Sequence, residues 1–90
     1  MKLAMFSNPA DLSAWAKRQA ELIRTHGLAT ARKEYAAARA GQGKAEWLDL
    51  NGIPAELADE YWKKHVNWHK GHVASLERKV RKLEKIAAEC

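Results

Sequence analysis

Three histidines in the second half of the chain have a spacing that could support metal or acid–base chemistry. His65, His69 and His72 stand four and three residues apart, which on a helix places their rings within about 60° of one another. Two such imidazoles can bind one Zn²⁺ or Ni²⁺ ion, and three could do so across a dimer axis. No cysteine or carboxylate shares this face at ligand spacing, so we predict no metal site. The leading interpretation is that these histidines lie beside Trp62 and Trp68 and stack or hydrogen-bond there. A histidine metal site and a pH-responsive interface are the alternatives.

Aromatic residues and lysines alternate in the same segment. They are Tyr61, Trp62, Lys63, Lys64, Trp68 and Lys70, with Trp47 a short distance before them. Rings interleaved with cations suit the stacking of single-stranded nucleic acid, or an anchor in a protein groove. The simpler interpretation is that large rings build the core of a short chain. Four tryptophans in 90 residues still favour at least one as an interface anchor.

The largest local excess of positive charge lies near the end of the chain. It contains Arg78, Lys79, Arg81, Lys82 and Lys85, opposed only by Glu84. Such a run usually forms a solvated helix face, and contact with phosphates is the alternative. Together with the predicted second helix, the candidate nucleic-acid contacts are Arg32, Lys33, Arg39, Arg78, Arg81, Lys82 and Lys85.

Catalytic motifs are missing from the sequence. There is no glycine-rich phosphate loop, no zincin pattern and no Gly-x-Ser-x-Gly elbow. Ser75 and His72 stand three apart on an exposed helix face, which forms no enclosed pocket, and Cys90 has no local group to activate it. We therefore predict a protein without enzymatic activity and without a cofactor.

The composition predicts a single small soluble domain. The formal net charge is +5, divided into +3 over residues 1–53 and +2 over residues 54–90. This even spread weakens the case for nucleic acid, although the run at 78–85 keeps it open. A lone cysteine favours a reducing, cytoplasmic setting. The apolar run Leu3–Phe6 is too short for a signal peptide or a membrane span, so no membrane partner is expected.

The elements that must position these residues are all predicted to be helices. A first helix is expected over 9–26, because Asn8 can cap it, Pro9 suits its first position and Gly27 is a left-handed stop. Its predicted inward face consists of Leu12, Trp15, Ala16, Leu22 and Ile23. An alanine-rich helix over 28–40 completes an N-terminal hairpin.

Two glycine-containing breaks separate this hairpin from a long final helix. Gly41-Gln-Gly43 is the first break, and Asn51-Gly52 followed by Pro54 is the second. Between them, Trp47, Leu48 and Leu50 are expected to plug the core. The prediction is an all-α fold in which the hairpin and loop of residues 1–53 pack with 54–70 as a three-helix head.

Beyond Gly71 the long helix keeps only a narrow apolar seam. Val73, Leu76, Val80, Leu83 and Ala87 recur at spacings of three and four, and valine at a with leucine at d favours a parallel two-stranded coiled coil. We predict that residues 72–88 project from the head and pair with another chain. The predicted interface consists of Trp62, Val66, His69, Val73, Leu76, Val80, Leu83 and Ala87.

These features favour a small helical interaction protein, acting as an adaptor, inhibitor or assembly factor. It would self-associate, most simply as a homodimer, or dock on a protein partner through its C-terminal helix. The alternative is a nucleic-acid-binding regulator, in which the zipper sets the spacing of half-sites. In shape, a helical head followed by a short zipper resembles many small regulators of bacteria, phages and mobile elements, but shape alone does not define function.

Overall fold

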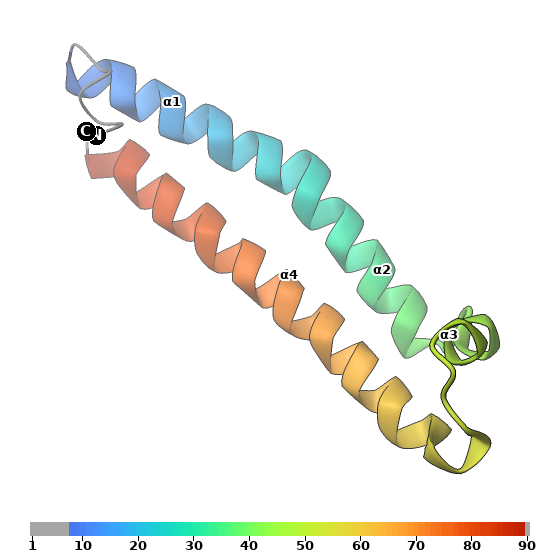
Figure 1. Ribbon diagram of the computed structural model, residues 1–90. Coiled ribbons are helices and arrows are strands. Elements are labelled where there is room, and N and C mark those ends of the chain that lie inside the picture. The colour runs from blue at the N-terminus through green and yellow to red at the C-terminus, as the bar shows by residue number, and fades with distance from the viewer. Residues whose placement is uncertain (1–7, 90) are drawn as a thin grey trace. The chain divides into compact units, whose positions relative to one another are not determined.

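A computed structural model describes residues 8–89 of the chain, and within them every regular element is a helix (Figure 1). This confirms the predicted all-α class. The elements are α1 (Pro9–Leu22), the π-helical segment η2 (Ile23–Leu28), α2 (Ala29–Arg39), α3 (Lys44–Leu50), the 3-10 turn η3 (Ala55–Leu57) and α4 (Ala58–Glu89). Leu3–Phe6 and Cys90 lie outside the described residues. No described helix is long and apolar enough to cross a membrane.

Helix α1 begins as its sequence predicts. The backbone N–H of Asp11 donates to Oδ1 of Asn8 at 3.0 Å, and Pro9 occupies the first turn. The cap satisfies one of the backbone donors that a helix start leaves without a partner. Pro9 costs nothing there because its missing N–H would have no helical acceptor.

The predicted end of this helix at Gly27 is wrong. Gly27 lies inside η2, a wide π turn that carries the chain from α1 directly into α2. Its φ is not positive, unlike those of Gly41, Gly43 and Gly52, so it does not form a left-handed stop. The residues expected to form a helical hairpin are therefore helical without interruption from Pro9 to Arg39.

The two later breaks are confirmed. Gly41 and Gly43 have φ values of 79° and 71°, and Gly52 has 63°, a region that a side chain disfavours. Helix α3 lies between the breaks. Its Leu50 is 86% exposed, so this residue does not plug the core as expected.

The described chain forms two compact units. Of the described residues, one unit contains 8–29 together with 75–89, and the other contains Thr30–Ala74. The first unit thus combines α1 with the last part of α4. The second unit combines α2, α3 and the first part of α4.

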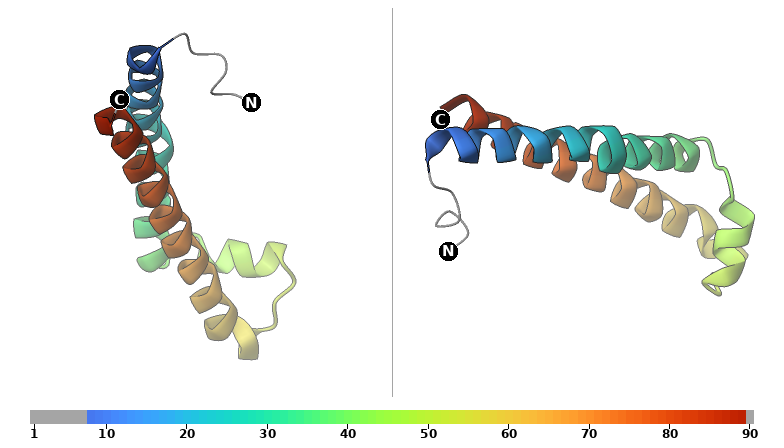
Figure 2. Two further views of the ribbon diagram at one scale, coloured as in Figure 1. Left: turned by 90° about the vertical axis from the view of Figure 1, so that its left-hand side faces the viewer. Right: turned by 90° about the horizontal axis from the view of Figure 1, so that it is seen from above.

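In the first unit, α1 and the end of α4 run antiparallel. Ser13 Oγ donates to the backbone oxygen of Ala87 at 2.7 Å, while a Cβ built on Gly27 would lie 4.0 Å from Cδ1 of Leu76. The start of one segment therefore meets the end of the other, and the views of Figures 1 and 2 agree. The buried side chains of this unit are Ala16, Ala20, Leu28 and Val80.

The segment predicted to project is therefore packed against its own chain, and that prediction is wrong. Val80 is 5% exposed and Val73 is 9% exposed. The physical reason is the small-residue face of α1, where Ala16 and Ala20 let the backbone of α4 approach closely. An apolar seam at spacings of three and four is satisfied equally well by a helix from the same chain.

In the second unit, α3 is tied to the start of α4. Lys44 Nζ donates to Oδ1 of Asp59 at 2.9 Å. This hydrogen bond, and then the charge of Lys44, lower the pKa of the Asp59 carboxyl. Since Asp59 is almost fully exposed, the pair adds little stability. The buried side chains here are Ala31, Ala38 and Val73.

Candidate functional site

The second unit contains a chain of rings that begins where α3 meets α4. The ring of Trp47 lies 5.4 Å from that of Trp62, at 72°, and 4.5 Å from that of His65. Trp62 and His65, three residues apart on α4, lie 4.8 Å from each other. These centroid distances are typical of edge-to-face and offset aromatic pairs. The three rings therefore form a mutual contact at the junction of the two helices.

The chain of rings continues along α4 toward solvent. The rings of His65 and His69 are 4.6 Å apart, and those of His69 and Trp68 are 5.0 Å apart. Trp68 and His72 are stacked at 5.3 Å with an interplanar angle of 14°. We call the set of Trp47, Trp62, His65, Trp68, His69 and His72 the ring cluster. One of its members, Trp68, is 62% exposed.

The α4 segment of the ring cluster lies in a stretch that contains lysines but no carboxylate, whereas Glu46 and Asp49 flank Trp47 on α3. Residues 61–76 contain three lysines and no aspartate or glutamate. Lys64 Nζ lies 5.1 Å from the centroid of Tyr61, a cation–π arrangement that holds the ammonium group beside the exposed rings. Tyr61 itself is 39% exposed. An exposed tryptophan, a partly exposed tyrosine and lysines thus share one stretch of helix without a compensating carboxylate.

The surroundings of His65 shift the pKa of its imidazole. Burial against its neighbours, and secondly the nearby charge of His69, lower the pKa of His65 below its ordinary value of 6.5. The neutral imidazole is therefore favoured in the folded state.

The alternative of a histidine metal site has no support in the described part of the chain. Within residues 8–89, no three His, Cys, Asp or Glu side chains gather where they could hold one ion. His65 and His69 meet edge to face, whereas His72 stacks on Trp68. The histidine rings thus contact tryptophans and each other.

Acidification is expected to destabilise the second unit through His65. Above about pH 6.5 the residue is neutral in both folded and unfolded chains, so its contribution to stability is fully present. As the pH falls below 6.5, the unfolded chain binds a proton that folded His65 resists, and the free energy of unfolding decreases. Urea unfolding followed between pH 7.5 and 5.5 measures this slope.

The matched variants identify the source of the slope. His65→Phe should flatten the dependence on pH, because the ring remains and the titration is lost. His26→Gln, at an exposed position of η2, should leave it unchanged. An equal effect of both substitutions would contradict a role for the ring cluster.

The predicted interface residues are placed in different surroundings. Val73 and Val80 are buried within the chain. The others are half-buried, namely Trp62, Val66, His69, Leu76, Leu83 and Ala87. The seam from 73 to 87 thus contributes to the chain's own packing, while Trp62 and His69 belong to the ring cluster. The sequence pattern indicated a face that packs against a helix, but it predicted that this helix belongs to another molecule.

The predicted nucleic-acid contacts fall on two helices. Arg32, Lys33 and Arg39 lie exposed on α2, and the guanidinium of Arg39 sits 5.4 Å from the ring centroid of Tyr35. On α4 four exposed basic residues line one shallow hollow of about 250 Å³, namely Arg78, Arg81, Lys82 and Lys85. The structure therefore gathers these four on one helix face.

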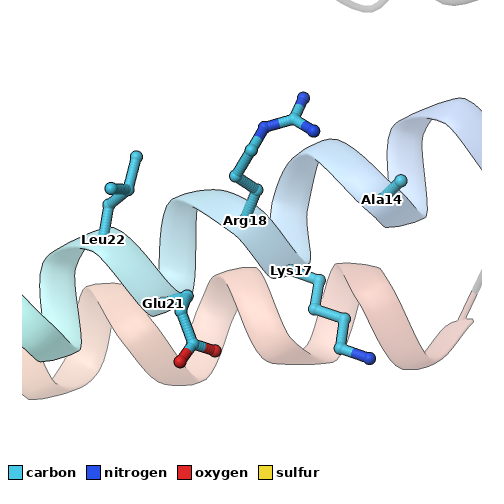
Figure 3. Close-up of a pocket in the computed structure, with 5 residues that line it drawn as sticks. All are labelled: Ala14, Lys17, Arg18, Glu21 and Leu22. Carbon is cyan, nitrogen blue, oxygen red and sulfur yellow. The ribbon is translucent and has the colours of Figure 1, made fainter.

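The other hollows of the first unit are open and shallow. One of about 310 Å³ lies on the outer side of α1, lined by Ala14, Lys17, Arg18, Glu21 and Leu22. Figure 3 shows Arg18 and Leu22 pointing to one side of the helix and Lys17 and Glu21 to the other. Leu22, predicted to face inward, is 46% exposed. Side chains that diverge in this way do not converge on a bound molecule.

The fold and its surface features define a small all-helical protein with an exposed ring cluster and a separate basic face. No family model, curated protein or solved structure matches the chain. Its function must therefore be argued from its own residues.

Sequence reasoning missed two features of these surfaces. The contact of Trp47 with Trp62 and His65 joins two helices, and the sequence suggested only that Trp47 packs somewhere in the core. The pairing of Arg24 with Glu84 was also missed, because 60 residues separate the partners. Neither contact has a signal in local spacing.

Proposed function

We propose that this chain is a non-enzymatic interaction protein that docks on a protein partner through the ring cluster of its second unit. The observation that carries the proposal is Trp68, 62% exposed yet held by stacking with His72 and by edge contact with His69. A large ring that is both exposed and held in place loses little conformational freedom on binding. Such residues are typical anchors of interfaces.

The charge of the surface supports a partner different from the chain itself. The stretch from 61 to 76 carries three lysines and no carboxylate, so two copies that met through this stretch of α4 would bring lysines against lysines. Like charges across an interface disfavour association. The partner we propose has an apolar pocket for Trp68, bordered by aspartate or glutamate. A reducing, cytoplasmic setting forms part of the proposal, as does the adaptor, inhibitor or assembly role.

The apolar seam of residues 73–87 supports the proposed contact indirectly. Val73 and Val80 are occupied within the chain, so they hold the helix that displays the rings. The proposed contact still lies on the C-terminal helix. It consists of the residues around Trp68 rather than of residues 73–87.

The test is crosslinking and affinity measurement with the full chain. A photoreactive group at Lys64, beside the rings, should crosslink one discrete protein from the source cells. The purified partner should then bind wild type and Trp68→Ala with affinities that differ by about 2 kcal/mol or more, roughly 30-fold, as expected for an anchoring tryptophan. Titration calorimetry gives both constants.

Asn67→Ala is the matched control. Asn67 is exposed on the same helix, about 100° around its axis from Trp68, and its loss should leave affinity within about twofold, as for a residue outside the anchor. If Trp68→Ala binds as tightly as wild type, the ring cluster is not the docking surface. Sedimentation equilibrium of the free chain distinguishes a self-associating protein, which would contradict the charge argument.

A further inference from the structure

The first unit carries a surface that the proposed protein contact does not use. Arg78, Arg81, Lys82 and Lys85 follow one another on α4 at intervals of three, one and three residues. On an α-helix this spacing places all four side chains on one face, over about 10 Å of the axis. All four are exposed and line one shallow hollow. We call these four residues the basic stripe.

The cations of the basic stripe are available for a ligand. Within residues 8–89, Arg78, Arg81 and Lys82 have no ion-pair partner. Lys85 has only a loose approach to Glu89, with Nζ and Oε1 4.0 Å apart and both side chains largely exposed. An exposed pair of this kind contributes little and is easily exchanged.

The nearby carboxylates do not neutralise the stripe. Glu84 is bound by Arg24 of η2, and Glu77 has a partner of its own. The fold thus uses these acids in its own contacts and leaves the cations on the outer face. A solvated helix face that only maintained solubility would be expected to mix both signs along its length.

The spacing of the stripe matches a phosphate backbone. One strand of a duplex presents about one phosphate per 3.4 Å of axis, so about 10 Å covers roughly three intervals and hence about four phosphates, one for each cation. The four residues that line the hollow are all arginine or lysine, and their cationic groups can contact phosphate oxygens. Contacts of this kind position a protein on nucleic acid without selecting its sequence.

We propose that the basic stripe is a sequence-independent binding site for the phosphodiester backbone of nucleic acid. This function is separate from the protein contact at the ring cluster and does not depend on it. Four phosphate contacts to a duplex predict a slope of about −3.6 for the logarithm of the binding constant against that of salt concentration. Raising salt from 50 to 200 mM should therefore weaken binding about 10²-fold.

The experiment measures fluorescence anisotropy of a random 20-base-pair DNA and a 20-nucleotide single strand, titrated with the full chain. The double variant Arg78→Gln/Lys82→Gln should reduce the slope by about 2. At 0.1 M salt it should weaken binding on the order of 50-fold, because each lost contact is worth about eightfold there. Trp68→Ala should leave slope and affinity unchanged, which separates this proposal from the first.

The matched control removes the same charge elsewhere in the same unit. Arg18→Gln/Lys79→Gln changes two exposed cations, one on α1 and one on the flank of α4 roughly 100° from the stripe. It should lower affinity less than threefold. Equal losses in the two double variants would overturn the proposal, as would polyglutamate of matched length binding the protein like DNA. Absence of binding at 50 mM salt would also overturn it, provided that circular dichroism shows each protein folded.

Discussion

Val80→Asp is expected to abolish the cooperative unfolding transition of the first unit. Val80 is 5% exposed and lies in the seam that faces α1. Burial of a valine is worth about 1.5–3 kcal/mol, all of which is lost. A carboxylate in its place must be buried without a partner or must push the helices apart. The combined loss exceeds about 4 kcal/mol, a large part of the stability of a small domain.

Circular dichroism during thermal unfolding measures this effect, and Ser75→Asp is its control. Ser75 is exposed on the same helix, so the new charge should change stability by less than about 0.5 kcal/mol. The pair also separates two architectures. If the seam paired two chains in a parallel coil, Val80→Asp would lower the sedimentation mass. Because the seam packs within one chain, the sedimentation mass should be the same for wild type and variant. The variant should instead lose its helical structure.

Ala16→Leu is expected to destabilise the same unit by overpacking. Ala16 is 0% exposed and Ala20 is 2% exposed, so three added heavy atoms have no space between the helices. Inserting methylene groups into a packed core typically costs about 1–3 kcal/mol. For a domain of this size each kcal/mol lowers Tm by about 4–8 °C. Differential scanning calorimetry gives the shift directly.

Ala14→Leu is the control for this prediction. Ala14 lies on the exposed side of α1, and leucine is nearly as good a helix former as alanine. Its effect should stay within about 0.5 kcal/mol. Equal Tm values for the two variants would show that α1 does not pack on α4 through its alanines. A higher Tm for Ala16→Leu would instead indicate a cavity that leucine fills.

The features that could be predicted from the sequence are those set by neighbouring residues. Asn8 and Pro9 define the start of α1, and the glycines at 41, 43 and 52 end or separate helices, because caps and left-handed turns depend on a few adjacent residues. The proximity of Trp62, His65 and His69 also follows from helical spacing alone.

The features that could not be predicted depend on which helix meets which. A seam such as Val73–Leu76–Val80 shows that a partner helix is needed, but its spacing is the same whether that helix comes from the same chain or another. The complementary face of α1 is made of alanines, whose small size gives a weak pattern. Gly27 was misassigned because a wide π turn has no local signature comparable to a left-handed glycine.

The modest size of the buried side chains has a thermodynamic consequence. Over residues 8–89 the buried set consists of four alanines with Leu28, Val73 and Val80, and in that range no large side chain is completely buried. The heat-capacity increment of unfolding scales with the apolar surface that becomes hydrated. With little such surface to hydrate, the protein should have a small increment, and its free energy of unfolding should therefore vary with temperature along a shallow curve.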